Sequence, residues 1–106
     1  MSRTWLIAAI LPALTACAIP EEDFPEEYGK QNCKRLQECN EDLFEEFDDM
    51  EDCTDAYADL MEPLLDLADL AGETYDPDGA RDCITNLKRA DCGDWEDGDF
   101  TCDLTL

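Results

Sequence analysis

The chain has 106 residues, of which 29 are Asp or Glu and seven are Lys or Arg, so its formal net charge is −22 at neutral pH. This charge excludes nucleic acid as a partner, because a phosphate backbone requires a cationic surface. The sequence contains no His, which removes the Ser-His-Asp and Cys-His catalytic constellations. A pair of carboxylates suits a glycosidase, but so small a domain is a poor host for a sugar-binding cleft. We therefore expect a protein that is not an enzyme.

The N-terminus has the three-part layout of a secretory signal. Arg3 supplies the positive region, residues 5–11 form an apolar run, and the small residues Thr15 and Ala16 follow it. A transmembrane helix needs roughly 20 apolar residues, and this run is shorter and is broken by Pro12. We expect residues 1–16 to be a signal peptide that is removed.

The segment Leu14-Thr15-Ala16-Cys17 ends this signal. It resembles the lipobox of bacterial lipoproteins, and the resemblance implies that Cys17 carries a diacylglyceryl group and becomes the acylated mature N-terminus, with palmitate as a typical added chain. The alternative is an ordinary signal peptide that is cut near Ala16 or Ala18. In enterobacterial lipoproteins an Asp after the lipidated Cys favours the inner membrane. Ala18 stands at that position here, so the resemblance implies the bacterial cell envelope and its outer membrane.

The remaining cysteines predict disulfides. Seven is an odd count, and six remain once Cys17 is lipidated: Cys33, Cys39, Cys53, Cys83, Cys92 and Cys102. In an exported protein this pattern reads as three disulfides. A zinc or iron–sulfur site is the competing interpretation, but no Cys-x-x-Cys pair and no His occur. We therefore expect no cofactor.

Residues 17–27 are predicted to form a lipidated Cys and an acidic tether, because Pro20 and Pro25 lie among acidic residues and favour an extended chain. The folded domain is then expected over residues 28–106. From residue 17 onward six basic residues face 29 acidic ones, which gives a net charge of −23. Contact with the membrane should therefore come from the lipid on Cys17, since the polypeptide is repelled by anionic headgroups.

The rest of the sequence predicts helices in chain order, because apolar residues recur at intervals of three and four. The first helix runs from about Pro25 to Cys39, and a short one carries the apolar stripe of Leu43, Phe44, Phe47 and Met50. That stripe is either core or a partner-binding face. Residues 53–71 form the longest periodic segment, which Pro63 should kink or divide.

The last clear helix has Asp76 as its N-cap and ends near Arg89, and the tail after Cys92 is predicted to be loop-like. The predicted fold is therefore all-α, a small disulfide-stapled helical bundle of three to four helices. An up-down-up arrangement suggests the pairs Cys39–Cys53, Cys33–Cys83 and Cys92–Cys102, although six cysteines allow 15 pairings.

Calcium binding is the alternative function, because carboxylate oxygens suit that ion and acidic residues are dense at Asp94, Glu96, Asp97 and Asp99. No EF-hand register fits this segment, and the plainer interpretation is a solvated acidic face. The expected function is thus a lipid-anchored, non-catalytic binding or structural module of the cell envelope. Its acidic surface would meet a cationic protein or another envelope partner. The domain resembles the small acidic cysteine-rich lipoproteins of unassigned activity, which adds no site residues.

Overall fold

Short polar side chains mark the start of most helices. The computed structural model describes residues 18–106, and its helices are α2 (Phe24–Cys39), α3 (Glu41–Phe44), α4 (Met50–Leu70), α5 (Pro77–Arg89) and α6 (Cys92–Asp97). The residue before each of the last four accepts a hydrogen bond from a first-turn N–H; these caps are Asn40, Asp49, Asp76 and Asp91. Each cap satisfies a donor that the helix leaves unpaired. The predicted all-α class is confirmed, since residues 18–106 form only one isolated β-bridge.

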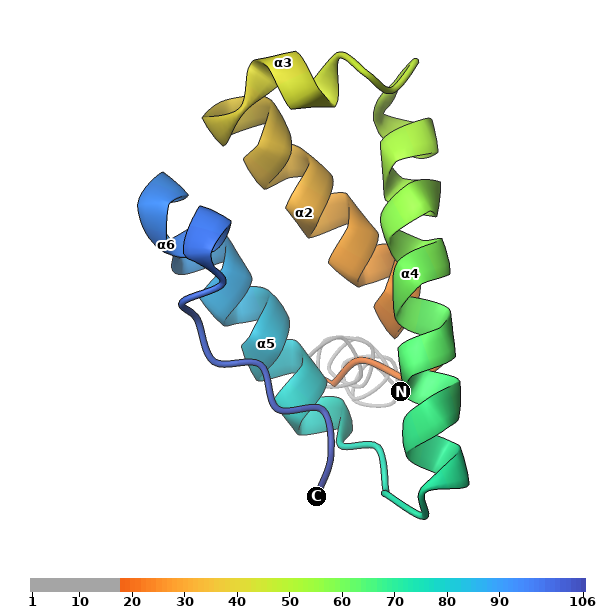
Figure 1. Ribbon diagram of the computed structural model, residues 1–106. Coiled ribbons are helices and arrows are strands. Elements are labelled where there is room, and N and C mark those ends of the chain that lie inside the picture. The colour runs from red at the N-terminus through yellow and green to blue at the C-terminus, as the bar shows by residue number, and fades with distance from the viewer. Residues whose placement is uncertain (1–17) are drawn as a thin grey trace, which may run out of the picture.

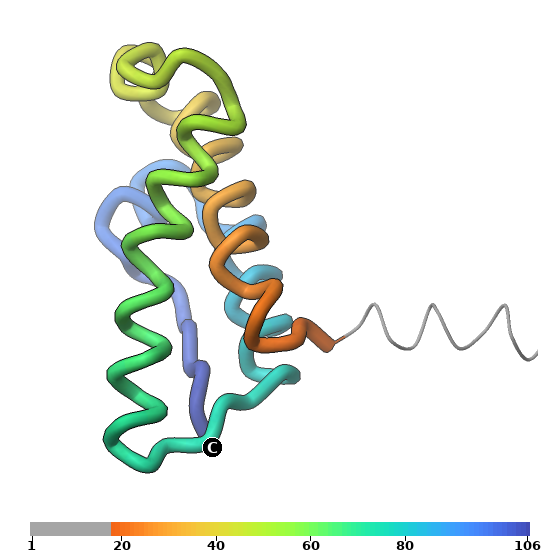
Figure 2. Tube along the Cα trace, turned by 90° about the vertical axis from the view of Figure 1, so that its right-hand side faces the viewer, coloured from red at the N-terminus to blue at the C-terminus, as the bar shows by residue number. Residues whose placement is uncertain are grey.

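Helix α2 is the centre of the fold. It packs against all four other helices, whereas α4 and α5 make little direct contact with each other. Figure 1 shows α4 and α5 on either side of α2, with α3 connecting the upper ends of α2 and α4. After α6 the chain returns along α5 toward the C-terminus, which Figure 2 shows from the side. The amide of Asn86 in α5 donates to the Thr101 carbonyl at 2.9 Å and ties this returning segment down.

The buried side chains form two clusters along α2. The lower cluster joins α2, α4 and α5 and contains Phe24, Met61, Leu65, Ala80, Cys83 and Ile84. The upper cluster is built on Cys33, Leu36 and Cys53, against which Phe44, Phe47, Met50, Tyr57 and Trp95 pack. Most of the predicted stripe of the short helix is therefore part of the core, while Leu43 is 45% exposed.

The predicted helices differ from the observed ones in three places. Helix α3 ends at Phe44, because Asp49 takes an extended conformation to cap α4 and the chain turns before it. Pro63 lies inside α4 without dividing it. The expected loop after Cys92 begins with α6, which is capped at both ends by Asp91 and by Gly98 in the left-handed conformation.

The three predicted disulfide pairs, Cys39–Cys53, Cys33–Cys83 and Cys92–Cys102, are wrong. The structure joins Cys33 to Cys53, Cys39 to Cys92 and Cys83 to Cys102, with Cα–Cα distances of 6.0, 5.4 and 4.2 Å. Six residues turn a helix by about 600°, so Cys33 and Cys39 project from α2 roughly 120° apart. One therefore meets α4 and the other meets α6. Cys102 lies on the segment that returns along α5, beside Cys83.

The folded domain begins before residue 28, so it includes part of the segment 17–27 that was predicted to be a tether. Phe24 is fully buried in the lower cluster, and Pro25 to Glu27 already belong to α2. The backbone of Ile19 donates to the Pro77 carbonyl at 3.3 Å and accepts from the Tyr75 hydroxyl at 2.7 Å. The chain is thus fixed to the domain from Ile19 onward. Burial of the large aromatic side chain of Phe24 contributes more free energy than is lost by holding the acidic residues beside it in place.

Candidate functional site

A cleft of about 470 Å³ opens between α2, α4 and α6. Its walls carry four half-buried aromatic side chains, which are Tyr28, Tyr57, Trp95 and Phe100. Leu36, Leu43, Asn32, Asn40, Gly98 and the acidic pair Glu96 and Asp97 complete the lining. We call this site the aromatic cleft. Aromatic side chains seldom gather at a surface by chance, since burial favours them strongly.

The aromatic rings are held by a short network on α2. The rings of Tyr28 and Tyr57 meet edge to face with centroids 6.4 Å apart. The indole N–H of Trp95 donates to Oδ1 of Asn32 at 3.1 Å, and the amide of Asn32 donates to the Tyr28 carbonyl at 2.9 Å. Asn32 is only 5% exposed, so both its donor and its acceptor are used within the fold. The cleft is therefore largely preformed.

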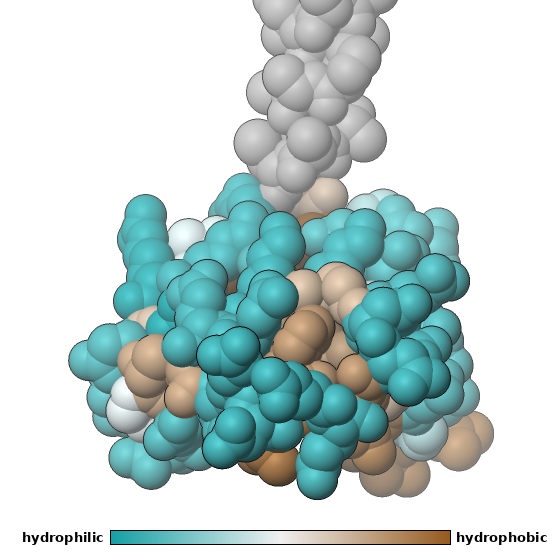
Figure 3. All heavy atoms as spheres, turned by 90° about the horizontal axis from the view of Figure 1, so that it is seen from above, coloured by the Kyte–Doolittle hydropathy of each residue, from teal (hydrophilic) through white to brown (hydrophobic). Residues whose placement is uncertain are grey.

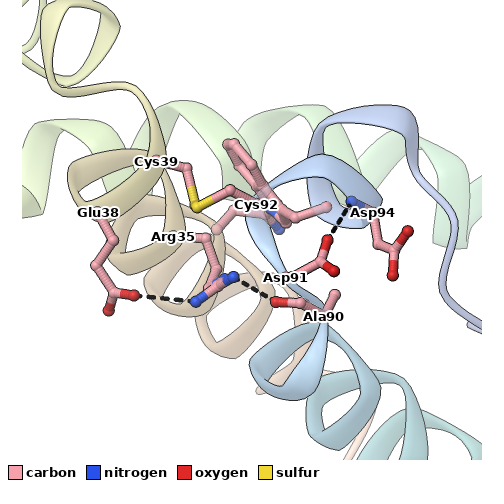
Figure 4. The surroundings of a disulfide bond; sticks show 9 residues. Arg35, Glu38, Cys39, Ala90, Asp91, Cys92 and Asp94 are labelled. Atoms are coloured by element: carbon pink, nitrogen blue, oxygen red, sulfur yellow. Dashed lines mark hydrogen bonds and ion pairs between the residues drawn. A yellow bond between two sulfur atoms is a disulfide. The ribbon is translucent and has the colours of Figure 1, made fainter.

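Two links from α2, one to the start of α6 and one to the end of α5, fix the position of Trp95. The first is the disulfide Cys39–Cys92. The second is the guanidinium of Arg35, which donates to the Ala90 carbonyl and pairs with Glu38 at 2.9 Å. Figure 4 shows the guanidinium between these two oxygens, next to the disulfide. The cation thereby satisfies a carbonyl at the C-terminal end of α5, where positive charge is favourable.

The electrostatics of the cleft favour a cation. No Lys or Arg lines it, whereas Glu96 and Asp97 do. Repulsion from Asp91 raises the pKa of the neighbouring Asp94 carboxyl, and Asp99 and Asp97 add to this effect together with slight burial. Negative charges crowded beside aromatic faces attract a cation both by Coulomb attraction and by cation–π contact.

The hydroxyl of Tyr57 keeps its proton at neutral pH. Burial raises the pKa of Tyr57 above its ordinary value of 10.0, and the nearby Tyr28 adds to the shift. The phenol therefore presents a neutral donor at the cleft and adds no further negative charge.

A second cavity of about 440 Å³ lies between α5 and the returning C-terminal segment. It is lined by Asp76, Asp82 and Asp103, by Arg89, and by small or polar residues of α5. Its charges have both signs and it has no aromatic wall. It therefore offers less than the aromatic cleft to a specific ligand.

The predicted site residues are distributed as follows. Cys17 lies outside the described residues. Asp94, Glu96, Asp97 and Asp99 lie on or just after α6, and only Glu96 and Asp97 reach the cleft. Within residues 18–106, no group of three or more Asp, Glu, Cys or His side chains is arranged to hold a metal ion.

The aromatic cleft is not predicted by the sequence. Tyr28 and Tyr57 follow the helical apolar pattern, which does not indicate that the fold leaves them half-exposed. A usable signal was present in Trp95, since an aromatic residue among acidic ones is unusual in a solvated face.

No helix within residues 18–106 combines the length and apolarity that a bilayer crossing demands. Comparison with protein-family models, with curated proteins and with solved structures finds no match for this chain.

Proposed function

We propose that this protein is a lipid-anchored, non-catalytic binding module of a bacterial envelope, and that its aromatic cleft receives a cationic group of a partner protein. The observation that carries the proposal is the combination of four aromatic walls, two carboxylates and no basic residue in one cleft. Lys and Arg side chains are the natural cations of a protein partner, and both bind aromatic faces that are flanked by carboxylates.

The lack of a His and of a free thiol after residue 17 supports a binding role. The sequence has no His, and the six cysteines after residue 17 are all paired in disulfides. A non-catalytic module also agrees with the large acidic surface, since complementary charge speeds the encounter with a cationic partner.

The lipobox-like segment supports the anchor and the location. Under this proposal Cys17 carries the lipid, and Ala18 directs the protein to the outer membrane if the envelope is Gram-negative. The acidic domain would then stand clear of anionic headgroups, because like charges repel.

The anchor is tested by Cys17→Ser. We expect the variant to leave the membrane fraction or to accumulate as unprocessed precursor, whereas the wild-type chain partitions into the detergent phase. A Cys17→Ser protein that loses residues 1–16 and still partitions into detergent would disprove lipid anchoring.

The cleft is tested by titrating the full-length protein with tetralysine while the Trp95 indole N–H is followed by NMR. We expect the indole signal to shift in the wild type. Calorimetric titration, which does not need the indole, should show that Trp95→Leu weakens binding about tenfold, because a cation–π contact contributes about 1–2 kcal/mol. Tetra-(acetyl-lysine) is the charge control and should not bind.

The carboxylates have a matched control. Glu96→Gln with Asp97→Asn should weaken tetralysine binding severalfold, whereas Glu45→Gln with Glu46→Gln removes the same charge from exposed positions outside the cleft. Equal losses in both double variants would show a diffuse charge effect and would contradict a site in the cleft.

A further inference from the structure

Helix α4 has a second apolar face that no other segment of residues 18–106 covers. Four of its leucines are exposed: Leu60 by 68%, Leu64 by 59%, Leu67 by 64% and Leu70 by 85%. They follow one another at intervals of four, three and three residues, so they form one stripe, which we call the leucine ridge. A different face of α4 holds Met61 and Leu65 in the core. Exposure of four large side chains in one stripe marks a contact surface.

The leucine ridge continues the wall of the aromatic cleft. Tyr57 lines the cleft and lies three residues before Leu60, on the same side of α4. Farther along, Leu64 lines a small hollow of about 70 Å³ together with Tyr75 and Leu104. Figure 3, seen from above, shows apolar residues reaching the surface between hydrophilic flanks. From Tyr57 to Leu70 the continuous surface is about 20 Å long, at 1.5 Å per residue.

The negative charge of α4 indicates which kind of partner fits this surface. The helix has no Lys or Arg, and its acidic residues are Glu51, Asp52, Asp55, Asp59, Glu62, Asp66 and Asp69. A second copy of this chain would bring two such helices together, carboxylate against carboxylate, and an anionic lipid surface would be repelled in the same way. A cationic partner pairs with the acidic flanks while its own apolar residues cover the leucines.

We infer that the leucine ridge and the aromatic cleft together bind an amphipathic helix of a partner protein that carries Lys and Arg beside an apolar stripe. The inference rests on the proposed function, because the cleft receives a cationic side chain of the same helix. Helices that lie in apolar grooves are anchored at intervals of three and four residues. A partner helix of about 14 residues matches the 20 Å length of the surface.

The test uses full-length protein in phosphatidylcholine nanodiscs and a designed 18-residue probe of leucine and lysine whose leucines fall on one helical face. We expect the probe to bind and to become helical by circular dichroism. Leu60→Ser with Leu64→Ser and Leu67→Ser should weaken binding at least about tenfold, since each buried leucine contributes strongly. All three positions are exposed, so the variant should remain folded.

Leu106→Ser is the control for the loss of an exposed leucine, because Leu106 is 85% exposed and does not belong to α4. It should leave the affinity unchanged. A scrambled probe of the same composition, which has no apolar face, should bind at least about tenfold more weakly than the designed probe.

Four outcomes would overturn the inference. The first three are wild-type affinity in the ridge variant, equal affinity of the scrambled and the designed probe, and ridge-dependent dimers that form without any probe. Binding to empty nanodiscs at the same affinity would assign the effect to lipid and would equally refute it. Tetralysine binding at the cleft is independent of the ridge. Failure of tetralysine to bind would therefore refute the proposed function. If tetralysine binds and the designed probe does not, only the inference about the ridge is refuted.

Discussion

Gly29 of α2 lies directly against the backbone carbonyl of Thr54 in α4, and there is no room between them for a Cβ atom. The two helices are therefore packed backbone to backbone at this point, one turn before the disulfide Cys33–Cys53 joins the same pair. Gly29 is buried, so neither the helix nor its neighbour has solvent into which to move. The close approach sets the height at which Tyr28 and Tyr57 face each other in the aromatic cleft.

We expect Gly29→Ala to destabilise the protein. Alanine improves helix propensity by about 1 kcal/mol, but overpacking in a closed interface costs about 1–3 kcal/mol and separates the helices. The net loss, up to about 2 kcal/mol, is measured by urea unfolding. Gly93→Ala is the control, because a Cβ there meets only the Asp91 carboxylate at ordinary contact distance. If Gly29→Ala were as stable as Gly93→Ala, the close packing of α2 on α4 would be wrong.

Arg35 should tolerate no substitution, even by lysine. Its side chain is 14% exposed and bridges Glu38 and the Ala90 carbonyl, which requires the fork of the guanidinium. Arg35→Lys preserves the net charge, so a loss of about 1–2 kcal/mol in unfolding free energy would come from the geometry alone. Lys34→Arg, at the exposed neighbouring position, should change stability by less than about 0.5 kcal/mol. Equal stability of the two variants would count against the bridge.

Local signals account for the parts of the fold that the sequence predicts well. Pro25 and the pair Asp76 and Pro77 place the starts of α2 and α5 within a residue, because capping depends on near neighbours. The segment from Asp91 to Gly98 also carries a cap at each end, yet α6 was missed because its six residues show no apolar period.

Long-range relationships account for the errors. The disulfide pairing depends on the angle between Cys33 and Cys39 around α2 and on where the tail returns, and neither is written in local sequence. The aromatic cleft brings Tyr28 and Tyr57 together with Trp95 from a short helix that only the fold positions. Periodicity identifies an apolar face but does not say whether the fold covers it, so the sequence alone does not predict the exposure of the leucine ridge.

Removal of the Cys39–Cys92 disulfide should release α6. Chain-entropy theory gives about 4 kcal/mol for a loop of this length, and 53 positions separate the two residues. We expect Cys39→Ser with Cys92→Ser to lose up to about that amount and to shift the Trp95 emission to longer wavelength in native buffer. Trp5→Phe in every chain keeps Trp95 the only indole.

The matched comparison is Cys83→Ser with Cys102→Ser, which opens a loop of 19 positions on the other side of the domain. It should cost about 3 kcal/mol and leave the Trp95 emission in place. A red shift in both double variants would show that the cleft depends on global stability and would contradict a specific clamp on α6.

Acid and salt should stabilise the protein, because the same Asp-x-x-Asp arrangement crowds two helix starts. Asp49 and Asp91 cap α4 and α6, and their repulsion raises the pKa of Asp52 and of Asp94, three residues on in each helix. Partial burial and the nearby Asp69 raise the pKa of Glu21 in the same direction. A carboxyl whose pKa is higher in the folded state binds its proton more tightly there. Its contribution to stability is therefore present at low pH and is lost as the pH rises through the folded value.

The melting temperature at low salt should consequently fall between about pH 4.5 and about pH 7.5, above the ordinary values of 3.8 for Asp and 4.5 for Glu. An acidic residue in the first turn normally favours a helix, but at these two positions repulsion from the capping carboxylate raises the pKa. Asp52→Asn with Asp94→Asn should therefore raise the melting temperature at about pH 7.5 and leave it unchanged at about pH 4.5. The rise should exceed the one that Glu45→Gln with Glu46→Gln produces.

Salt should raise the melting temperature by screening. Sodium chloride at matched ionic strength should give most of the rise in melting temperature that calcium gives, since screening does not depend on the ion. Maximal stability above pH 7 at low salt would refute the repulsion argument, and a large gain with micromolar calcium alone would revive the metal-binding alternative.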